Sequence, residues 1–126
     1  MSSYPYDHSF DPSAPVIEMT VRSPNAAATR LVQALLDTGA DQTVIPEDTA
    51  RELGLVRLDE VNVFGVSPDP VLARVYWVSA RLVELSDLDI EVLSWPYQYA
   101  LVGRDLLNRL RLILDGPQLQ LTLEEP

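Results

Sequence analysis

The sequence predicts an all-β fold with one or two short helices, and three observations lead to this prediction. Short apolar stretches recur along the chain, and several alternate apolar and polar residues with the two-residue period of a half-buried strand. Turn signals that contain Gly, Pro, Asn or Asp separate these stretches. Only two stretches have helical character, and both are short. This combination is typical of a compact β domain.

A hairpin is predicted at the start of the domain. Residues 16–22 (VIEMTVR) alternate between apolar and polar side chains. The stretch SPNAA at residues 23–27 is a turn signal, and residues 29–37 (TRLVQALLD) continue as an extended apolar run. The two strands are therefore expected to pair with each other and to end at Asp37.

A short helix is predicted after the stretch TVIP. Pro46 suits the start of a helix, Glu47 and Asp48 place negative charge in its first turn, and Gly54 can end it. The helix would be roughly two turns long.

The second half of the chain is predicted to contain further strands and one more helical stretch. Extended segments between residues 61 and 85 flank the turn signal GVSPDP. Residues 90–95 (IEVLSW) and 100–103 (ALVG) are strand candidates, and residues 104–110 (RDLLNRL) have helical character. Residues 110–123 are predicted to form a leucine-rich hairpin around an Asp-Gly turn.

The chain has 126 residues, which is the length of one domain and enough to bury a core. Residues 16–126 are predicted to form this single domain, and residues 1–15 an N-terminal arm. The arm holds three prolines and little periodicity, which leaves open whether it is flexible or becomes ordered on a partner.

The composition excludes several classes of function. There is no cysteine, and His8 is the single histidine, so a Ser-His-Asp triad or a histidine-rich metal site would depend on that residue. The net charge of −10 argues against nucleic-acid binding. No apolar run approaches membrane-spanning length, and the N-terminus has no signal-peptide pattern. We therefore expect a soluble, cytoplasmic protein without a cofactor or metal ion and without contacts to nucleic acid or membrane.

The stretch LLDTGADQTVIP at residues 35–46 carries the clearest functional signal. An apolar strand runs directly into Asp37-Thr38-Gly39, and an apolar stretch follows the turn. Taken alone, Asp37 could be a simple turn residue, because the tripeptide should occur by chance in roughly a few per cent of chains of this length. A second apolar run that ends in glycine, Leu101-Val102-Gly103, precedes the later helical stretch and strengthens the signal.

Both motifs, in this order and spacing, resemble those of the retroviral-type aspartic proteases, or retropepsins, and their stand-alone cellular or bacterial relatives. The matching pieces are LLDTGA, TVIP with the helix after it, a flap-like hairpin around Gly65, and LVGRDLL. They extend over roughly residues 16–123. The resemblance implies a closed, mostly antiparallel β-barrel that is active as a C2 homodimer, with two copies meeting at their Asp-Thr-Gly turns.

The resemblance also implies roles for the active-site loop. Asp37 would be the catalytic aspartate, and the hydroxyl of Thr38 would tie together the loops of the two copies. Gly39 would let the substrate backbone approach closely, and Ala40 completes the matched loop.

Further roles follow from the same resemblance. Leu35, Val44 and Leu101 fall where the family lines its substrate side-chain pockets, and Gly65 and Val66 fall in the flap that covers the substrate. The flap departs from the family pattern, because it has one glycine and two prolines where viral flaps are glycine-rich.

Asp41 and Arg104 match a structural ion pair of the family that lies beside the active-site turn. The alternative reading of these two residues is an exposed ion pair, which would contribute less than about 1 kcal/mol.

The implied activity is that of an aspartic endopeptidase, which needs two carboxylates that share a proton. The chain contains one Asp-Thr-Gly, so the second carboxylate would come from Asp37 of another copy. The expected partners are thus a second copy of the chain and a peptide or protein substrate. Two alternatives stay open, namely a non-catalytic peptide-binding or dimerisation module of the same fold and an unrelated β domain with a chance Asp-Thr-Gly.

Overall fold

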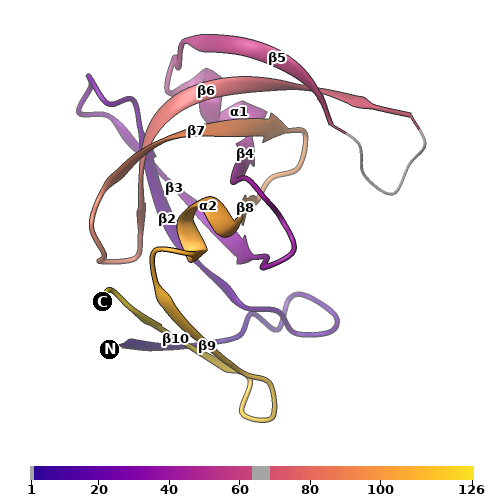
Figure 1. Ribbon diagram of the computed structural model, residues 1–126, viewed down its shortest axis with the longest axis vertical. Helices are drawn as coiled ribbons and strands as arrows, with labels where there is room; N and C mark the ends of the chain where they lie inside the picture. The colour runs from indigo at the N-terminus through magenta and orange to yellow at the C-terminus, as the bar shows by residue number, and fades with distance from the viewer. Residues whose placement is uncertain (1, 64–68) are drawn as a thin grey trace.

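The computed structural model describes residues 2–63 and 69–126, and it consists mostly of strands (Figure 1). The strands are β1 (Ser2–Pro5), β2 (Val16–Arg22), β3 (Thr29–Leu36), β4 (Val44–Pro46), β5 (Arg57–Val63), β6 (Val71–Leu82), β7 (Leu88–Trp95), β8 (Ala100–Val102), β9 (Arg111–Asp115) and β10 (Gln120–Glu124). The helices are α1 (Glu47–Glu52) and α2 (Arg104–Leu107). Both helices are short, as the sequence predicts.

Seven strands form one sheet in the order β2-β3-β8-β4-β7-β6-β5. Strand β2 also pairs with β6, so that six of these strands close into a barrel and β5 extends the sheet beyond β6. The pairings β3–β8 and β4–β7 are parallel, whereas the others are antiparallel. The prediction of a closed, mostly antiparallel barrel is confirmed.

The core lies inside this barrel. Strands β2 and β3 form the predicted hairpin, and the alternation along β2 buries Met19 and Val21 completely while Glu18 is exposed. Apolar residues on alternate positions of a strand point to the same face, which explains how a short alternating sequence supplies one side of the core. The largest fully buried side chains from the other barrel strands are Ile45, Val78 and Val92, with Val102.

Helix α1 has the predicted boundaries. It begins directly after Pro46, carries Glu47 and Asp48 in its first turn, and is followed by Gly54. Gly54 has a φ of 61°, a left-handed conformation that glycine adopts without a steric penalty.

The N-terminal segment differs from the predicted arm. Strand β1 pairs antiparallel with β10 of the same chain, and the amide of Tyr6 donates a hydrogen bond to the carbonyl oxygen of Leu119 at 2.8 Å. Tyr4 and Tyr6 pack against the core. This segment is thus the edge strand of a three-stranded sheet, β1-β10-β9, shown at the bottom of Figure 1. Pro5 is compatible with an edge strand, because the outer edge needs no amide donor.

The predicted C-terminal hairpin is present as β9 and β10. Leu121 and Leu123 are buried, whereas Leu119 lies in the turn with a φ of 50° and is exposed. The predicted flap residues Gly65 and Val66 lie outside the described residues, between β5 and β6, which pair antiparallel.

Within residues 2–63 and 69–126, no helix has both the length and the apolar character needed to cross a membrane.

Candidate active site

Asp37 is the first residue after β3, and the neighbouring strand holds its backbone. Its amide donates a hydrogen bond to the carbonyl oxygen of Val102 in β8 at 3.0 Å. Its own carbonyl oxygen accepts a hydrogen bond from the amide of Ala40 at 3.2 Å, which closes a tight turn. Asp37 is half-buried, whereas Thr38 and Gly39 at the tip of the turn are exposed.

The carboxylate of Asp37 lies over the backbone of its own turn. The amide of Gly39 donates a hydrogen bond to Asp37 Oδ1 at 2.9 Å. A Cβ atom at position 39 would lie 3.2 Å from the same oxygen, a distance that is tighter than ordinary contact. Glycine at this position therefore lets the turn hold the carboxylate in one orientation.

A buried polar cluster joins the far end of the loop to α2. The carboxylate of Asp105 accepts hydrogen bonds from the amide of Thr43 at 3.0 Å and from its hydroxyl at 2.7 Å. Thr43 Oγ1 in turn accepts a hydrogen bond from the amide of Gly103 at 3.2 Å. Thr43 is fully buried, so these bonds satisfy polar groups that water cannot reach. The sequence motifs do not single out Thr43 and Asp105. Their only local signals are a lone threonine beside an apolar run and an acid in the first turn of a predicted helix.

Arg104, the first residue of α2, contacts the loop at three points. Its amide donates to the carbonyl oxygen of Ala40 at 2.8 Å, and its Nη1 donates to the carbonyl oxygen of Thr38 at 2.9 Å. Its Nη2 forms an ion pair with the carboxylate of Asp41, which is the pair that the sequence singles out. Asp41 is 89% exposed, so the ion pair itself contributes little stability, and the backbone contacts do more to position the loop.

Gly103 permits this close approach. A Cβ atom at position 103 would lie 2.7 Å from the backbone carbon of Gln42 and 2.8 Å from its nitrogen. No side chain fits between these two backbones, so the second sequence motif needs glycine here for a steric reason.

The three predicted pocket residues lie side by side in register. Leu35 is the cross-strand partner of Leu101, which is the partner of Val44. The row continues to Leu93 and then to Val75, and residues that are paired in this way point to the same face of the sheet. Leu35, Leu101, Val44 and Leu93 are half-exposed, unlike their neighbours along each strand, which are buried. We call these five residues the apolar row.

The apolar row begins two residues before Asp37 and leads away from it across the sheet. Residues two apart on an extended strand share a face, so Leu35 and Asp37 lie on the same side. Sequence analysis did not identify Leu93 and Val75 as members, because their place in the row depends on the parallel pairing of β4 with β7.

One cavity lies at the far end of the apolar row. It has a volume of about 320 Å³, and it is lined by Val75 and Leu93 of the row, by Gln42 of the active-site loop, and by Leu58, Asp59, Val61 and Glu91. It therefore adjoins the same loop that carries Asp37.

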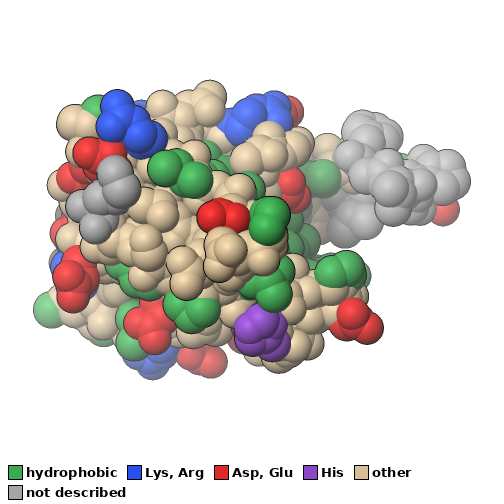
Figure 2. Space-filling model, turned by 90° about the horizontal axis from the view of Figure 1, so that it is seen from below, with side chains coloured by type: hydrophobic (Ala, Val, Ile, Leu, Met, Phe, Trp, Pro, Cys, Tyr) green, Lys and Arg blue, Asp and Glu red, His purple; other side chains and the backbone are tan. Residues whose placement is uncertain are grey.

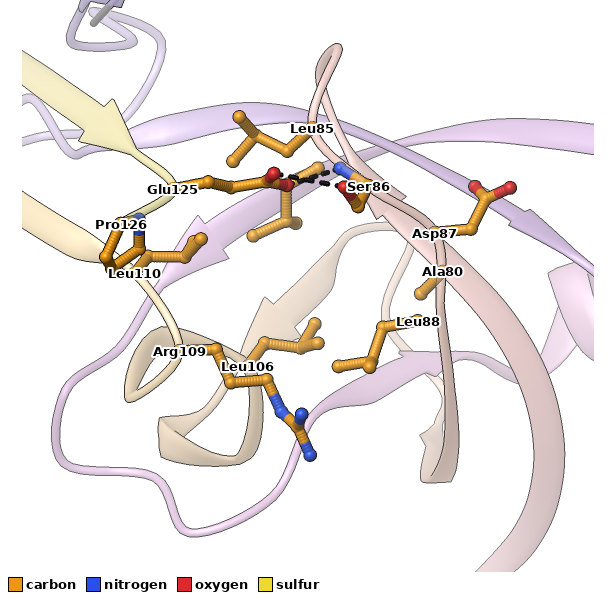
Figure 3. A pocket seen from close by; sticks show the side chains of 11 residues that line it. Ala80, Leu85, Ser86, Asp87, Leu88, Leu106, Arg109, Leu110, Glu125 and Pro126 are labelled. Atoms are coloured by element: carbon orange, nitrogen blue, oxygen red, sulfur yellow. Dashed lines mark hydrogen bonds between the residues drawn. The ribbon is translucent and has the colours of Figure 1, made fainter.

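Another cavity of about 240 Å³ lies elsewhere, between the β6–β7 turn, α2 and the C-terminal residues (Figure 3). Leu85, Leu106 and Leu110 contribute apolar walls, and the carboxylate of Glu125 accepts hydrogen bonds from the amide and the hydroxyl of Ser86. It shares no residue with the Asp37 turn or the apolar row, so it is not the candidate active site.

The candidate site combines a carboxylate with an adjoining apolar surface. The exposed turn and the four half-exposed residues of the row can accept an extended chain, and the carboxylate can accept or donate a proton. Within residues 2–63 and 69–126, no three His, Asp or Glu side chains lie close enough together to hold a metal ion.

Comparison with known proteins agrees with this geometry. A family model described as gag-polyprotein putative aspartyl protease matches residues 27–109, which is more than half of the chain. No curated protein shows significant sequence similarity to the chain.

Several solved structures share the fold. The EIAV protease in complex with the inhibitor HBY-793 matches with a TM-score of 0.55 at 20% identity, over 75% of this chain and 86% of that chain. The simian foamy virus (mac) protease in solution gives a TM-score of 0.55 at 18% identity, over 75% of this chain and 92% of that chain. A foamy viral protease-reverse transcriptase in complex with double-stranded DNA gives 0.54 at 20% identity, and only 15% of its length is covered.

Proposed function

Because the chain belongs to the family of gag-polyprotein putative aspartyl proteases, we propose that it is an aspartic endopeptidase whose catalytic group is Asp37. The observation that carries the proposal is the position of the Asp37 carboxylate. It lies on a turn directly after a barrel strand, one of its oxygens accepts a hydrogen bond from Gly39, and the apolar row begins beside it. The half-exposed side chains of Leu35, Val44 and Leu101 would bind the side chains of an extended peptide.

The chemistry needs a second carboxylate. An ionised carboxylate takes a proton from a water molecule, which attacks the peptide carbonyl carbon, while a protonated one donates to the carbonyl oxygen. Two carboxylates about 3 Å apart cannot both ionise cheaply, so the pair keeps one proton, as is known for aspartic proteases. The water then adds directly, without a covalent enzyme intermediate.

A second copy of the chain would supply that carboxylate. The sequence has one Asp-Thr-Gly, and a two-fold axis brings identical residues together. The exposure of Thr38 and Gly39 supports an interface at this turn, because both are accessible in the single chain. Thr38 would hold the two loops together, Ala40 and the Asp41–Arg104 pair would position each loop, and Gly65 and Val66 would cover the bound peptide.

The proposal is tested with the variant Asp37→Asn, which keeps the shape of the side chain and removes its acid. Cleavage of a denatured protein mixture should fall by at least about 10³-fold, since the general base is lost. The matched control is Asp115→Asn, which changes the aspartate of the Asp115-Gly116 pair at the end of β9 and should retain full activity.

A statine-type peptide, whose hydroxyl replaces the attacking water, should inhibit cleavage by the unsubstituted protein. Equal cleavage by the unsubstituted protein and by Asp37→Asn would refute the catalytic role of Asp37. Peptide binding without any cleavage would instead identify a binding module of the same fold.

A further inference from the structure

The cavity at the end of the apolar row has the size of a pocket for one long side chain. Its volume of about 320 Å³ is at the lower end of the range for ligand pockets, which begins at about 300 Å³. Leu58, Val61 and Leu93 give it apolar walls, and Gln42 connects it to the active-site loop. The amide nitrogen of the Gln42 side chain donates to the carbonyl oxygen of Glu91 at 3.3 Å, which fixes that connection.

Two carboxylates lie among these apolar walls. Asp59 is the cross-strand partner of Val75, so it extends the apolar row by one strand onto β5. Glu91 lies two residues before Leu93 on β7 and therefore on the same face. Among the described residues, neither carboxylate has an arginine within ion-pair distance, and the only hydrogen bond to the Asp59 side chain comes from the amide of Glu60 at 2.7 Å.

The nearby arginines, Arg57 and Arg74, interact with other acids. Glu60 lies next to Asp59 on β5 and so points to the opposite face of the strand. Its Oε1 is 2.6 Å from Arg57 Nη1 and 3.8 Å from Arg74 Nε. Arg74 Nη1 is also 3.2 Å from Glu47 Oε1, so both arginines pair with acids that do not line the cavity. Among the described residues, the carboxylates of Asp59 and Glu91 have no basic partner.

An exposed aromatic ring flanks the same place. Trp77 is the cross-strand partner of Glu91, and it is 43% exposed. The face of an indole ring attracts cations, most often the guanidinium group of arginine. The net charge of −10 favours the approach of a basic peptide, and acidic side chains also lie at several places on the lower face of the molecule, which Figure 2 shows.

We propose that this cavity is a specificity subsite that selects an arginine or lysine side chain of the peptide substrate. The inference rests on the proposed function and adds to it the charge of the preferred substrate. The methylene groups of the basic side chain pack on Leu58, Val61 and Leu93, and its charged end lies between Asp59 and Glu91. An acidic side chain at the same position is repelled, which adds to the discrimination.

The position of the basic residue relative to the cleaved bond is fixed. Asp37 and Gln42 belong to one loop, which Arg104 and Asp105 hold to α2. The distance from the catalytic carboxylate to the cavity is therefore a property of the rigid barrel. Because two copies form the proposed cleft, the preference should appear at one position on each side of the scissile bond, at equal distances from it.

The test uses the full chain and ten-residue peptides that carry either arginine or glutamine at each position in turn. At one position, kcat/KM for the arginine peptide should exceed that for the glutamine peptide by about tenfold or more, which corresponds to about 1.4 kcal/mol. The double variant Asp59→Asn and Glu91→Gln should bring this ratio close to one.

The matched control is the double variant Glu60→Gln and Asp89→Asn. It removes the same number of charges from the same two strands, but neither residue lines the cavity. It should keep the arginine preference of the unsubstituted protein. A preference that is lost equally in both double variants would show a general charge effect and would overturn the subsite.

Binding separates this inference from the proposed function. In an Asp37→Asn background, the dissociation constants of the arginine and glutamine peptides can be compared with and without the Asp59 and Glu91 substitutions. Tighter binding of the arginine peptide that depends on these two residues supports the subsite, even if no peptide is ever cleaved. Equal binding of the two peptides, or cleavage without any preference for a basic residue, overturns it and leaves the proposed protease activity intact.

Discussion

Thr43 and Asp105 are 62 residues apart in the sequence, and the carboxylate of Asp105 accepts two hydrogen bonds from Thr43. One comes from the amide at 3.0 Å and the other from the hydroxyl at 2.7 Å. This contact holds the end of the loop that begins at Asp37 against α2.

Thr43→Val should destabilise the protein, because valine has the same shape but removes the hydroxyl that donates to Asp105. Loss of a hydrogen bond to a charged, partly buried group costs about 1–3 kcal/mol. The free energy of unfolding can be measured by urea denaturation. Thr43→Ser keeps the hydroxyl and should lose clearly less, so equal losses in the two variants would contradict the role of this bond.

Gly103→Ala should be disruptive, whereas Gly116→Ala should be tolerated. The new Cβ at position 103 would lie 2.7 Å from the backbone of Gln42, and the backbone cannot move aside as a flexible side chain can. Overpacking of this kind costs about 1–3 kcal/mol or more. At position 116 no atom lies within 4 Å of the new Cβ. Thermal unfolding of both variants decides the matter, and a similar melting temperature for the two would show that the loop accommodates a side chain.

When the unsubstituted chain and Asp37→Asn are mixed in equal amounts, activity should be about a quarter of that of the same total amount of unsubstituted chain. For the proposed dimer, random pairing gives two intact Asp37 residues in about a quarter of all dimers, and only these would contain the complete pair of carboxylates. Subunit exchange is verified with a mass-tagged variant. A fully exchanged mixture that keeps half of the activity would mean that each chain has its own complete site.

Tyr76 should make the stability of the protein fall at high pH. Burial, together with the hydrogen bond that the Tyr76 hydroxyl donates to Glu47 at 2.7 Å and the negative charge of Glu47, raises the pKa of Tyr76 from 10.0 to about 12. Between these two values the unfolded chain loses the proton and the folded chain keeps it. The stabilisation is therefore complete below pH 10 and is lost as the pH rises towards 12.

Unfolding measured from pH 8 to pH 12 checks this dependence. Tyr76→Phe should remove part of the decline, whereas Tyr97→Phe, at a side chain that is 58% exposed, should leave it unchanged. An identical decline in both variants would assign the effect to other groups.

Much of the fold could be predicted from the sequence because the signals are local. The alternation along residues 16–22 determines which side chains of β2 are buried, and Pro46 and Gly54 mark the limits of the first helix. The Asp-Gly turn predicts the β9–β10 hairpin in the same way. Each of these features depends on residues within a few positions of one another, where backbone geometry and turn chemistry act directly.

The pairing of β1 with β10 could not be predicted in this way. Residues 2–5 have no alternation and end in a proline, so nothing local distinguishes an edge strand from a loose arm. The strand forms because β10 has a free edge and because Tyr4 and Tyr6 find apolar neighbours, which are properties of the folded chain.

By itself, the sequence determined that this chain is a β domain with short helices, and it singled out Asp37, Leu35, Val44 and Leu101 through two motifs some sixty residues apart. Only the tertiary structure decided that Leu35, Val44 and Leu101 form one row with Leu93 and Val75, and that the row ends at a cavity lined by two carboxylates, neither of which has a basic partner among the described residues. The physical reason is that strand order and register are set by hydrogen bonds between distant parts of the chain and by burial of the whole core. No short stretch of sequence contains that information.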